Sequence, residues 1–452
     1  MLTDRPNNEN NNGADRTVRA LDNGYREKIS DPYCVERFGG KAISGSSSSI
    51  RSEELVVTNI LPSLQVTRGS IDDSRRQYFV DPKGNDGNPG TAELPWQTIQ
   101  KGAKSALPGS VVNVMPGEYH GQVNVTVSGN ERDGFITFRS AMPGKAVLDL
   151  KSEPVHDDDA AGFMIHNGKF IELSGFEIKN LRASKADATP NGVVVNGSSN
   201  DIRINDLDIH HIENNINRNS NAHGISIYGD SSAGIKNIVI ANNKLHDLKL
   251  GASEALVING NVENFQISAN RLYNLNNIGI DVVGFEGTAK AGVDQARHGI
   301  INDNFVTEVD SRGNPAYGRT RSAGGIYVDG GTSIKISGNR VERANIGIEL
   351  ASEHRNRNTS DIEVSNNVLR NNTLAGIILG GADYTNGGAS NISIHNNQLI
   401  DNDTDRTNTG EIGFQNHVTK ARIEANRIIT HGRIISGPTA GQIIRDNQID
   451  KA

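Results

Sequence analysis

Residues 238–272, IVIANNKLHDLKLGASEALVINGNVENFQISANRL, contain a short motif that recurs along the chain. A short apolar run leads to an Asn two residues before an apolar residue, first as IVIANNKL and again as FQISANRL. The pattern returns six more times, with 21 to 35 residues between successive shared Asn positions. These positions are Asn243, Asn270, Asn304, Asn339, Asn367, Asn397, Asn426 and Asn447. The chain is therefore an array of structural repeats.

Each repeat holds two or three short runs in which apolar and polar residues alternate, a period that is typical of β-strands. Short Val- and Ile-rich strands, Gly and Asn at the corners, and a variable repeat length predict an all-β fold, the right-handed parallel β-helix. We expect the repeated Asn to lie in a sharp turn. There it would adopt the left-handed backbone region and bond to its neighbours in adjacent coils. Its expected role is structural.

Composition excludes several classes of protein. No apolar run approaches eighteen residues, which argues against a membrane span, and 35% hydrophobic residues argue against a disordered chain. The chain has 46 Lys and Arg residues and 53 Asp and Glu residues, and this net charge of −7 argues against binding nucleic acid through phosphate neutralisation. Cys34 is the only cysteine, so internal disulfides and multi-cysteine zinc sites are excluded.

The chain divides into two regions. Residues 1–76 are polar and include a Ser-rich run at 44–49, so we predict a partly disordered extension before a β-helix domain over 77–452. The N-terminal MLTDRPNNENNN has no apolar signal segment. Parallel β-helices of this kind often act outside the cell, so a secreted or extracellular location is nevertheless expected.

Residues 78–121 read as a strand, a turn cluster, an amphipathic helix, a turn and a strand. Trp96, Ile99, Ala103 and Leu107 form its apolar helical stripe. Because the end of a β-helix leaves backbone groups unpaired, a short capping helix is expected over the first coil. The segment resembles the N-terminal cap of secreted pectate-lyase-like β-helix proteins. GFITFRSAMPGKAVLDL (134–150) resembles the early coils of the alginate lyase and chondroitinase B family. Both resemblances imply the fold and not the chemistry.

One strand of each coil can be aligned by sequence. The aligned segments are HGISIYGD (223–230), SEALVING (253–260), IGIDVVGF (278–285), GGIYVDGG (324–331), IGIELASEH (346–354) and AGIILGGA (375–382). The alignment places two aliphatic columns inward: Ile225, Ala255, Ile280, Ile326, Ile348, Ile377, and Ile227, Val257, Val282, Val328, Leu350, Leu379. It places two columns outward: Ser226, Leu256, Asp281, Tyr327, Glu349, Ile378, and Tyr228, Ile258, Val283, Asp329, Ala351, Gly380.

Four successive coils carry acidic residues on the outward side: Glu254, Asp281, Asp329 and Glu349. Asp329 and Glu349 lie on neighbouring coils with an offset of two residues, which places their Cβ atoms roughly 8 Å apart. Their carboxyl groups could converge to the separation of about 5 Å found in retaining glycosidases. Two such groups titrate at different pH, so one can act as nucleophile and the other as acid. A solvated acidic face or a calcium site is an equally open interpretation.

Two long loops flank these strands, FEGTAKAGVDQARHG (285–299) and TEVDSRGNPAYGRTRSAGG (307–325). Long loops on one region of a solenoid commonly build its binding face, so we predict a walled cleft. The residues expected to contact substrate there are Tyr228, Tyr327, His298, Tyr317, Arg321, Glu353 and His354. The loops are also expected to bring Glu286, Asp294, Arg297 and Arg319 toward the acidic residues. Tyr228 and Tyr327 could stack on sugar rings.

GGIYVD (324–329), followed one coil later by IGIELASEH (346–354), resembles the active-site strands of the β-helical β-xylosidase family. The resemblance implies Asp329 as nucleophile, Glu349 as general acid/base and His354 near the substrate. The chain departs from that family because it is shorter and shows no appended sandwich domain. The favoured prediction is therefore a retaining hydrolase that cleaves glycosidic bonds of a polysaccharide or oligosaccharide.

Two alternatives remain open at this point. A polysaccharide lyase would need a cation to neutralise a uronate and a base to take its proton. Glu254 and Asp281 could hold calcium in such an enzyme, and Arg297 is the candidate base, since the strand positions that carry basic residues in alginate lyase and chondroitinase B are Asn259 and Val283 here. A glycan-binding or phage-tail-type β-helix without catalysis is the second alternative. No cofactor is certain.

Overall fold

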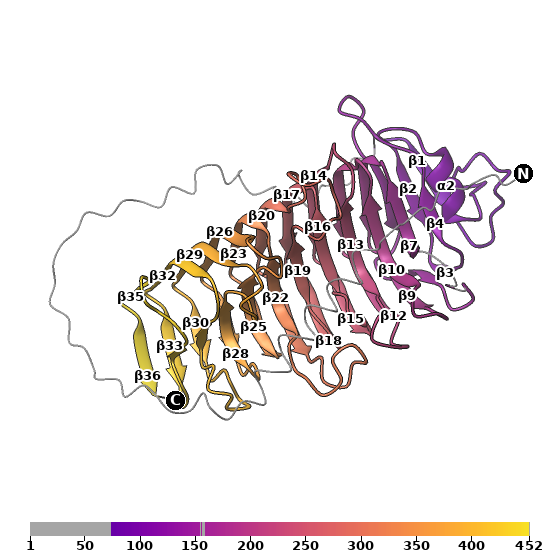
Figure 1. Cartoon of the computed structure of the whole chain (residues 1–452). Coiled ribbons are helices and arrows are strands. Elements are labelled where there is room, and N and C mark those ends of the chain that lie inside the picture. The colour runs from indigo at the N-terminus through magenta and orange to yellow at the C-terminus, as the bar shows by residue number, and fades with distance from the viewer. Residues whose placement is uncertain (1–73, 154, 156–158, 452) are drawn as a thin grey trace, which may run out of the picture.

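The computed structural model describes residues 74–153, 155 and 159–451. The chain winds into coils stacked along one axis, with α2 (Ile99–Ser105) at the first coil and β36 (Gln448–Lys451) at the last (Figure 1). Three sheets run along this axis, and their strands pair in parallel. The prediction of an all-β, right-handed parallel β-helix is confirmed. The predicted extension over 1–76 lies, except for its last three residues, outside the described residues.

Each sheet takes about one strand from every coil. The first sheet contains β1 (Gln77–Val80), β2 (Val111–Val114), β5 (Ile136–Ser140), β8 (Lys169–Ser174), β11 (Asn200–Asn205), β14 (Ile235–Ala241), β17 (Val262–Ser268), β20 (Arg297–Asn302), β23 (Thr332–Ser337), β26 (Asn358–Ser365), β29 (Gly388–His395), β32 (Val418–Glu424) and β35 (Ile443–Arg445). The second contains β4 (Val123–Val125), β7 (Asp159–His166), β10 (Thr189–Asn196), β13 (His223–Gly229), β16 (Leu256–Gly260), β19 (Ile280–Val283), β22 (Gly324–Asp329), β25 (Ile346–Ala351), β28 (Ala375–Leu379), β31 (Ile412–Phe414) and β34 (Ile435–Ser436). The third contains β3 (Gly117–Tyr119), β6 (Ala146–Asp149), β9 (Glu177–Arg182), β12 (Asp208–Glu213), β15 (Lys244–Leu248), β18 (Arg271–Leu275), β21 (Phe305–Val309), β24 (Arg340–Ala344), β27 (Val368–Arg370), β30 (Gln398–Ile400), β33 (Arg427–Thr430) and β36.

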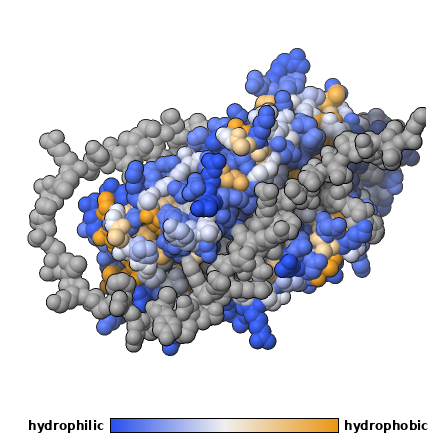
Figure 2. Space-filling model, in the orientation of Figure 1, coloured by the Kyte–Doolittle hydropathy of each residue, from blue (hydrophilic) through white to orange (hydrophobic). Residues whose placement is uncertain are grey.

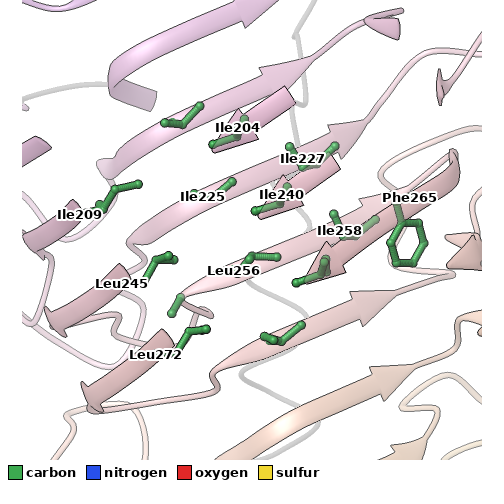
Figure 3. Close-up of a cluster of buried hydrophobic side chains, with 14 of the residues drawn as sticks. Ile204, Ile209, Ile225, Ile227, Ile240, Leu245, Leu256, Ile258, Phe265 and Leu272 are labelled. Atoms are coloured by element: carbon green, nitrogen blue, oxygen red, sulfur yellow. The ribbon is translucent and has the colours of Figure 1, made fainter. Parts of the chain in front are cut away.

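The core is a set of aliphatic columns inside the coils, where side chains from the three sheets meet (Figure 3). The predicted inward columns are confirmed in five of the six aligned strands. In the remaining strand, SEALVING (253–260), the predicted alignment was wrong by one residue. Leu256 and Ile258 pair with Ile225 and Ile227 and point inward (Figure 3). The register shifts by one residue just before β16. There the carbonyl oxygen of Ala255 accepts hydrogen bonds from the N–H groups of two successive residues in the previous coil, Gly224 and Ile225.

The repeated Asn residues form a buried ladder along the coils. At each step the main-chain N–H and the side-chain Nδ2 of one Asn donate to Oδ1 of the next; both distances are 2.9 Å from Asn243 to Asn270. The ladder runs through all eight positions to Asn447. The expected left-handed backbone belongs instead to the residue before the ladder Asn, such as Asn242 (φ 58°) or Ala269 (φ 55°). The Asn side chain is thereby free to point into the stack.

The predicted cap is present over the first coil. Thr98 begins α2 by accepting a hydrogen bond from the main-chain N–H of Lys101, and Ile99 and Ala103 of the helix are buried. Trp96 precedes the helix and is also buried, stacking on Tyr78 with ring centroids 4.7 Å apart. Leu107 does not complete the predicted stripe, because it lies beyond the end of α2 and is exposed.

The surface of the coils is mostly hydrophilic on the face in view (Figure 2). Three exposed isoleucines, Ile443, Ile444 and Ile449, lie in the last coil, where no further coil covers them within the described ranges. No helix of the described residues has the length and apolarity needed to cross a bilayer.

Candidate functional site

The outer face of the second sheet carries a pocket of about 650 Å³ that reaches from β10 to the residues that follow β28. One outward column of this face pairs Asp281 with Tyr327 and Tyr327 with Glu349 in consecutive coils. Asp329 lies two residues further along, opposite Ala351, as the sequence predicted. Eight acidic side chains line the pocket. Six of them act on one another's charge, and we call these six the carboxyl cluster: Glu254, Asp281, Glu286, Asp329, Glu349 and Glu353.

Asp329 is held by the turn that follows β25. The main-chain N–H of Glu353 donates to Asp329 Oδ1 at 2.8 Å, and His354 in the same turn lies close enough to stabilise a negative charge on Asp329. Burial, and then the neighbouring Glu286 carboxylate, raise the pKa of Asp329 to about 7, although the charge of His354 and the N–H of Glu353 act in the opposite direction. Asp329 is therefore the member of the Asp329–Glu349 pair that ionises first.

Glu349 has a different environment. Burial, and then the charge of Asp329, raise its pKa to about 8. Its carboxyl group has no hydrogen-bond partner among the described residues and lines the pocket. At neutral pH the pair therefore divides into an ionising Asp329 and a protonated Glu349. This is the division of roles that an acid and a nucleophile require.

Three other acids of the cluster, Glu254, Asp281 and Glu353, are also kept from ionising. Burial raises the pKa of Glu254 to about 8, and burial followed by the charge of Glu254 raises the pKa of Asp281 well above its usual range. Burial and Asp329 have the same effect on Glu353. Asp281 is 3% exposed, and its Oδ1 has no hydrogen-bond partner in the described structure. The pocket therefore offers several proton donors and acceptors that the protein does not satisfy.

The three predicted tyrosines all line the pocket. Tyr228 stands on β13, and its hydroxyl is 3.1 Å from Nε2 of His223. Tyr327 lies between Asp281 and Glu349 in its column and is buried. Tyr317 comes from the long loop before β22, and its hydroxyl accepts a hydrogen bond from Asn277 at 3.2 Å. The prediction that this loop reaches the acidic residues thus holds for Tyr317.

The four basic candidates from the loops, Arg297, His298, Arg319 and Arg321, do not line the pocket, so their expected positions were wrong. Arg297 and His298 begin β20 in the first sheet, where both pair with Glu263 at 3.1 Å and 3.3 Å. Arg321 pairs with Asp310 and Asp405 instead. Sequence reasoning placed Arg297 in the loop, but it already belongs to the next strand, which faces a different side of the coil.

The predicted metal pair, Glu254 and Asp281, is not the group with the most suitable geometry. Within the described ranges, the side chains able to share one ion are Glu286, Asp329 and His354, whose candidate ligand atoms lie within 4.8 Å of one another. Calcium prefers oxygen ligands, so an imidazole in this group fits calcium poorly. His354 Nε2 already lies 3.4 Å from Glu286, and this pairing helps to raise the pKa of His354.

The pocket contains no positively charged Lys or Arg side chain among its described lining residues. Asn, Ser, Thr and Tyr side chains supply most of its remaining polar surface. A ligand with its own negative charges would meet the carboxyl cluster without a protein cation to neutralise it. The lining therefore suits uncharged ligands that present hydroxyl groups.

Sequence reasoning missed His223, Asn196 and Asn259 as pocket residues. Asn259 was hidden by the register error in β16, which turned Ile258 outward in its place. With the correct register, Asn196, Tyr228 and Asn259 fall into one outward column, a signal that the sequence does contain.

Comparison with known proteins supports the fold. A family model for a Pel9A-like, right-handed β-helix region matches residues 78–249, which end before the carboxyl cluster. The GH136 lacto-N-biosidase from Eubacterium ramulus is similar with a TM-score of 0.61 and 13% identity, covering 83% of this chain and 68% of that protein. An alginate lyase from Paenibacillus sp. strain FPU-7 has a TM-score of 0.52 and 16% identity, with coverages of 71% and 95%. At such identities these similarities show the fold alone.

A nearer relative covers most of the chain. The protein YwoF from Bacillus subtilis (strain 168) is 39% identical over 366 residues, which span 81% of this chain and 77% of YwoF. The chain therefore belongs to the same family as YwoF, and its fold is the pectate-lyase-like, right-handed parallel β-helix found in carbohydrate-active enzymes.

Proposed function

We propose that the protein is a retaining glycoside hydrolase that acts on an uncharged polysaccharide or oligosaccharide. One observation carries the proposal: a pocket whose described lining residues include eight carboxyl groups and no Lys or Arg. Acid–base work on a glycosidic bond requires two carboxyl groups of different pKa, and Asp329 and Glu349 have this property. The lacto-N-biosidase, a glycosidase by its name, shares the scaffold.

The proposed reaction has two steps. In the first, Glu349 donates its proton to the glycosidic oxygen as the bond to the anomeric carbon breaks, and the Asp329 carboxylate forms a bond to that carbon. In the second, the Glu349 carboxylate takes a proton from water, and the water oxygen displaces Asp329. The N–H of Glu353 and the charge of His354 stabilise Asp329 when it is released.

A uronate lyase is the less favoured candidate. Its substrate carries a carboxylate on each reacting sugar, and elimination requires that this charge be neutralised and that a base remove a proton. Arg297, the base that the sequence offered, lies in the first sheet and pairs with Glu263. No specific contact of the described pocket favours this reaction.

The proposal is tested by incubating the full-length protein with two panels of glycans, one neutral and one containing uronates. We expect new reducing ends from a neutral glycan, without the ultraviolet absorbance of an unsaturated sugar, and no loss of activity on chelation. Unsaturated products from a uronate glycan, lost on chelation, would show that the enzyme is a lyase. Because such glycans lie outside the cell, the proposal agrees with the expected extracellular location.

A further inference from the structure

The pocket extends past the carboxyl cluster toward the N-terminal coils, where Asn side chains outnumber the two acidic ones, Asp187 and Asp230. Asn196, Tyr228 and Asn259 lie in register on β10, β13 and β16 and line the pocket there. Adjacent strands are about 4.8 Å apart, so the tyrosine side chain lies between two amide side chains. Asn259 is 8% exposed, and Asn196 and Tyr228 are half-buried. The three residues form a continuous polar and aromatic strip in the floor of the pocket.

The two amides are oriented by their neighbours. Oδ1 of Asn196 accepts a hydrogen bond from Nδ1 of His166 at 2.8 Å, and Oδ1 of Asn259 accepts one from the hydroxyl of Thr288 at 2.7 Å. Thr288 belongs to the long loop that follows β19, so a contact from this loop fixes the orientation of the Asn259 side chain. Neither Nδ2 has a hydrogen-bond partner among the described residues. Two N–H₂ groups are therefore available to oxygen atoms of a ligand.

Tyr228 is oriented by a buried histidine. Nδ1 of His223 lies 3.0 Å from the carbonyl oxygen of Glu254 and must donate to it, which leaves Nε2 as an acceptor. The Tyr228 hydroxyl therefore donates to Nε2. His223 is 2% exposed, and burial lowers its pKa to about 4, so this arrangement persists at neutral pH. The aromatic ring is held in a fixed position beside the two amides.

We propose that Asn196, Tyr228 and Asn259 form an outer subsite for an uncharged glycosyl unit, remote from the bond that is cleaved. The inference rests on the proposed function, because it assumes that cleavage occurs at Asp329 and Glu349. β13 lies three coils from β22, which corresponds to about 14 Å along the axis. A single sugar cannot occupy both places, so the preferred substrate is an oligosaccharide. Its remote unit stacks on Tyr228 and accepts hydrogen bonds from the two amides.

The test compares substrates of increasing length. The probes are aryl monoglycosides and labelled neutral oligosaccharides of the xylose, glucose, galactose and N-acetylhexosamine series. For wild-type protein, kcat/KM should rise with chain length until the outer subsite is filled. In Tyr228→Ala, the ratio of kcat/KM for the longest to the shortest substrate should fall at least about tenfold, mainly through KM. Asn196→Ala and Asn259→Ala should each lower that ratio several-fold.

Tyr384→Ala is the matched control, because Tyr384 is 77% exposed and does not line the pocket. Thermal unfolding of each variant separates a folding defect from a binding defect. If Tyr228→Ala keeps the wild-type dependence on chain length, the outer subsite is wrong while hydrolysis stands. If no probe is cleaved, the proposed function fails, and titration of the longest oligosaccharides into Asp329→Asn then decides the subsite. If Asp329→Asn and the double variant Asp329→Asn/Tyr228→Ala bind the longest oligosaccharides with equal affinity, the outer subsite is wrong.

Discussion

At the scale of single residues, the chemistry depends on how differently Asp329 and Glu349 are surrounded. Asp329 accepts a hydrogen bond from the main chain of Glu353 and lies near His354, whereas Glu349 has no hydrogen-bond partner in the described structure. Two carboxyl groups in one buried site cannot ionise equally, and these contacts determine which ionises first. The two residues therefore cannot exchange roles: Asp329 is the nucleophile, and Glu349 is the general acid and then the general base.

Substitution of the pair should separate these roles. Asp329→Asn should reduce kcat by a factor on the order of 10⁴ for every substrate, and the variant should still fold because this side chain supports no core. Glu349→Gln should retain activity on activated aryl glycosides, whose leaving groups need little protonation. Azide should restore turnover to Glu349→Gly by intercepting the glycosyl-enzyme. Steady-state kinetics checks each result, and equal losses on activated and ordinary substrates would refute the assignment of Glu349.

The raised pKa values also predict how activity depends on pH. Activity needs Asp329 ionised and Glu349 protonated, so kcat should rise through about pH 7 and fall through about pH 8. Glu349→Gln should abolish the falling limb on activated substrates. A profile of kcat measured from pH 5 to 10 checks this, and an optimum near pH 4.5 would show that the pair is not desolvated in the active enzyme.

The raised pKa of Glu349 also makes the stability of the fold depend on pH. Between the ordinary pKa of Glu349 and its raised value of about 8, the folded chain holds a proton that the unfolded chain releases. The free energy of unfolding must therefore fall as pH rises through this window. Glu349→Gln removes that loss, so at pH 8 its Tm should exceed that of wild type by a few degrees, with no difference near pH 4. A variant that is less stable at pH 8 would contradict the burial of an unpaired carboxyl group.

At the scale of elements, the Asn ladder determines how one coil sits on the next. Asn339 donates to Asn367, and its Oδ1 accepts two hydrogen bonds from Asn304. Asn339→Ala should leave buried donors unsatisfied and lower the free energy of unfolding by about 2–3 kcal/mol. Asn358→Ala, an exposed control outside the ladder, should change it by less than about 0.5 kcal/mol. Urea unfolding of the two variants measures the difference, and equal effects would mean that the ladder contributes no stability.

Much of each element was predictable because its signal is local. Alternating Val and Ile residues identify the strands, and the repeated Asn identifies the turns, so the fold and the columns on β22 and β25 followed from sequence. The register of β16 did not, since Leu256, Val257 and Ile258 are all apolar and give no alternation to follow. The sequence also does not show where the long loop after β19 ends. Arg297 was therefore predicted in that loop, although it begins β20 on another side of the coil.

At the scale of the whole molecule, one face of the β-helix carries a long pocket with a polar lining, and the carboxyl cluster lies on its middle coils, between β16 and the turn after β25. Its repeats are close in shape, so function depends on which coils carry which outward residues. The sequence predicted Asp281, Asp329 and Glu349 on one face, but the participation of His223 and Asn259 depends on contacts between coils. Such contacts are fixed only when the register of every coil is known.

The proposed mechanism requires that Asp329 form a covalent bond to the sugar. The most direct measurement is mass spectrometry of the full-length protein after reaction with a slowly hydrolysed, activated 2-deoxy-2-fluoro glycoside of a sugar that it cleaves. We predict a mass increase of one glycosyl unit, located by digestion to the peptide that contains Asp329 and absent from Asp329→Asn. Turnover without any adduct, or an adduct on a different residue, would contradict the proposed mechanism.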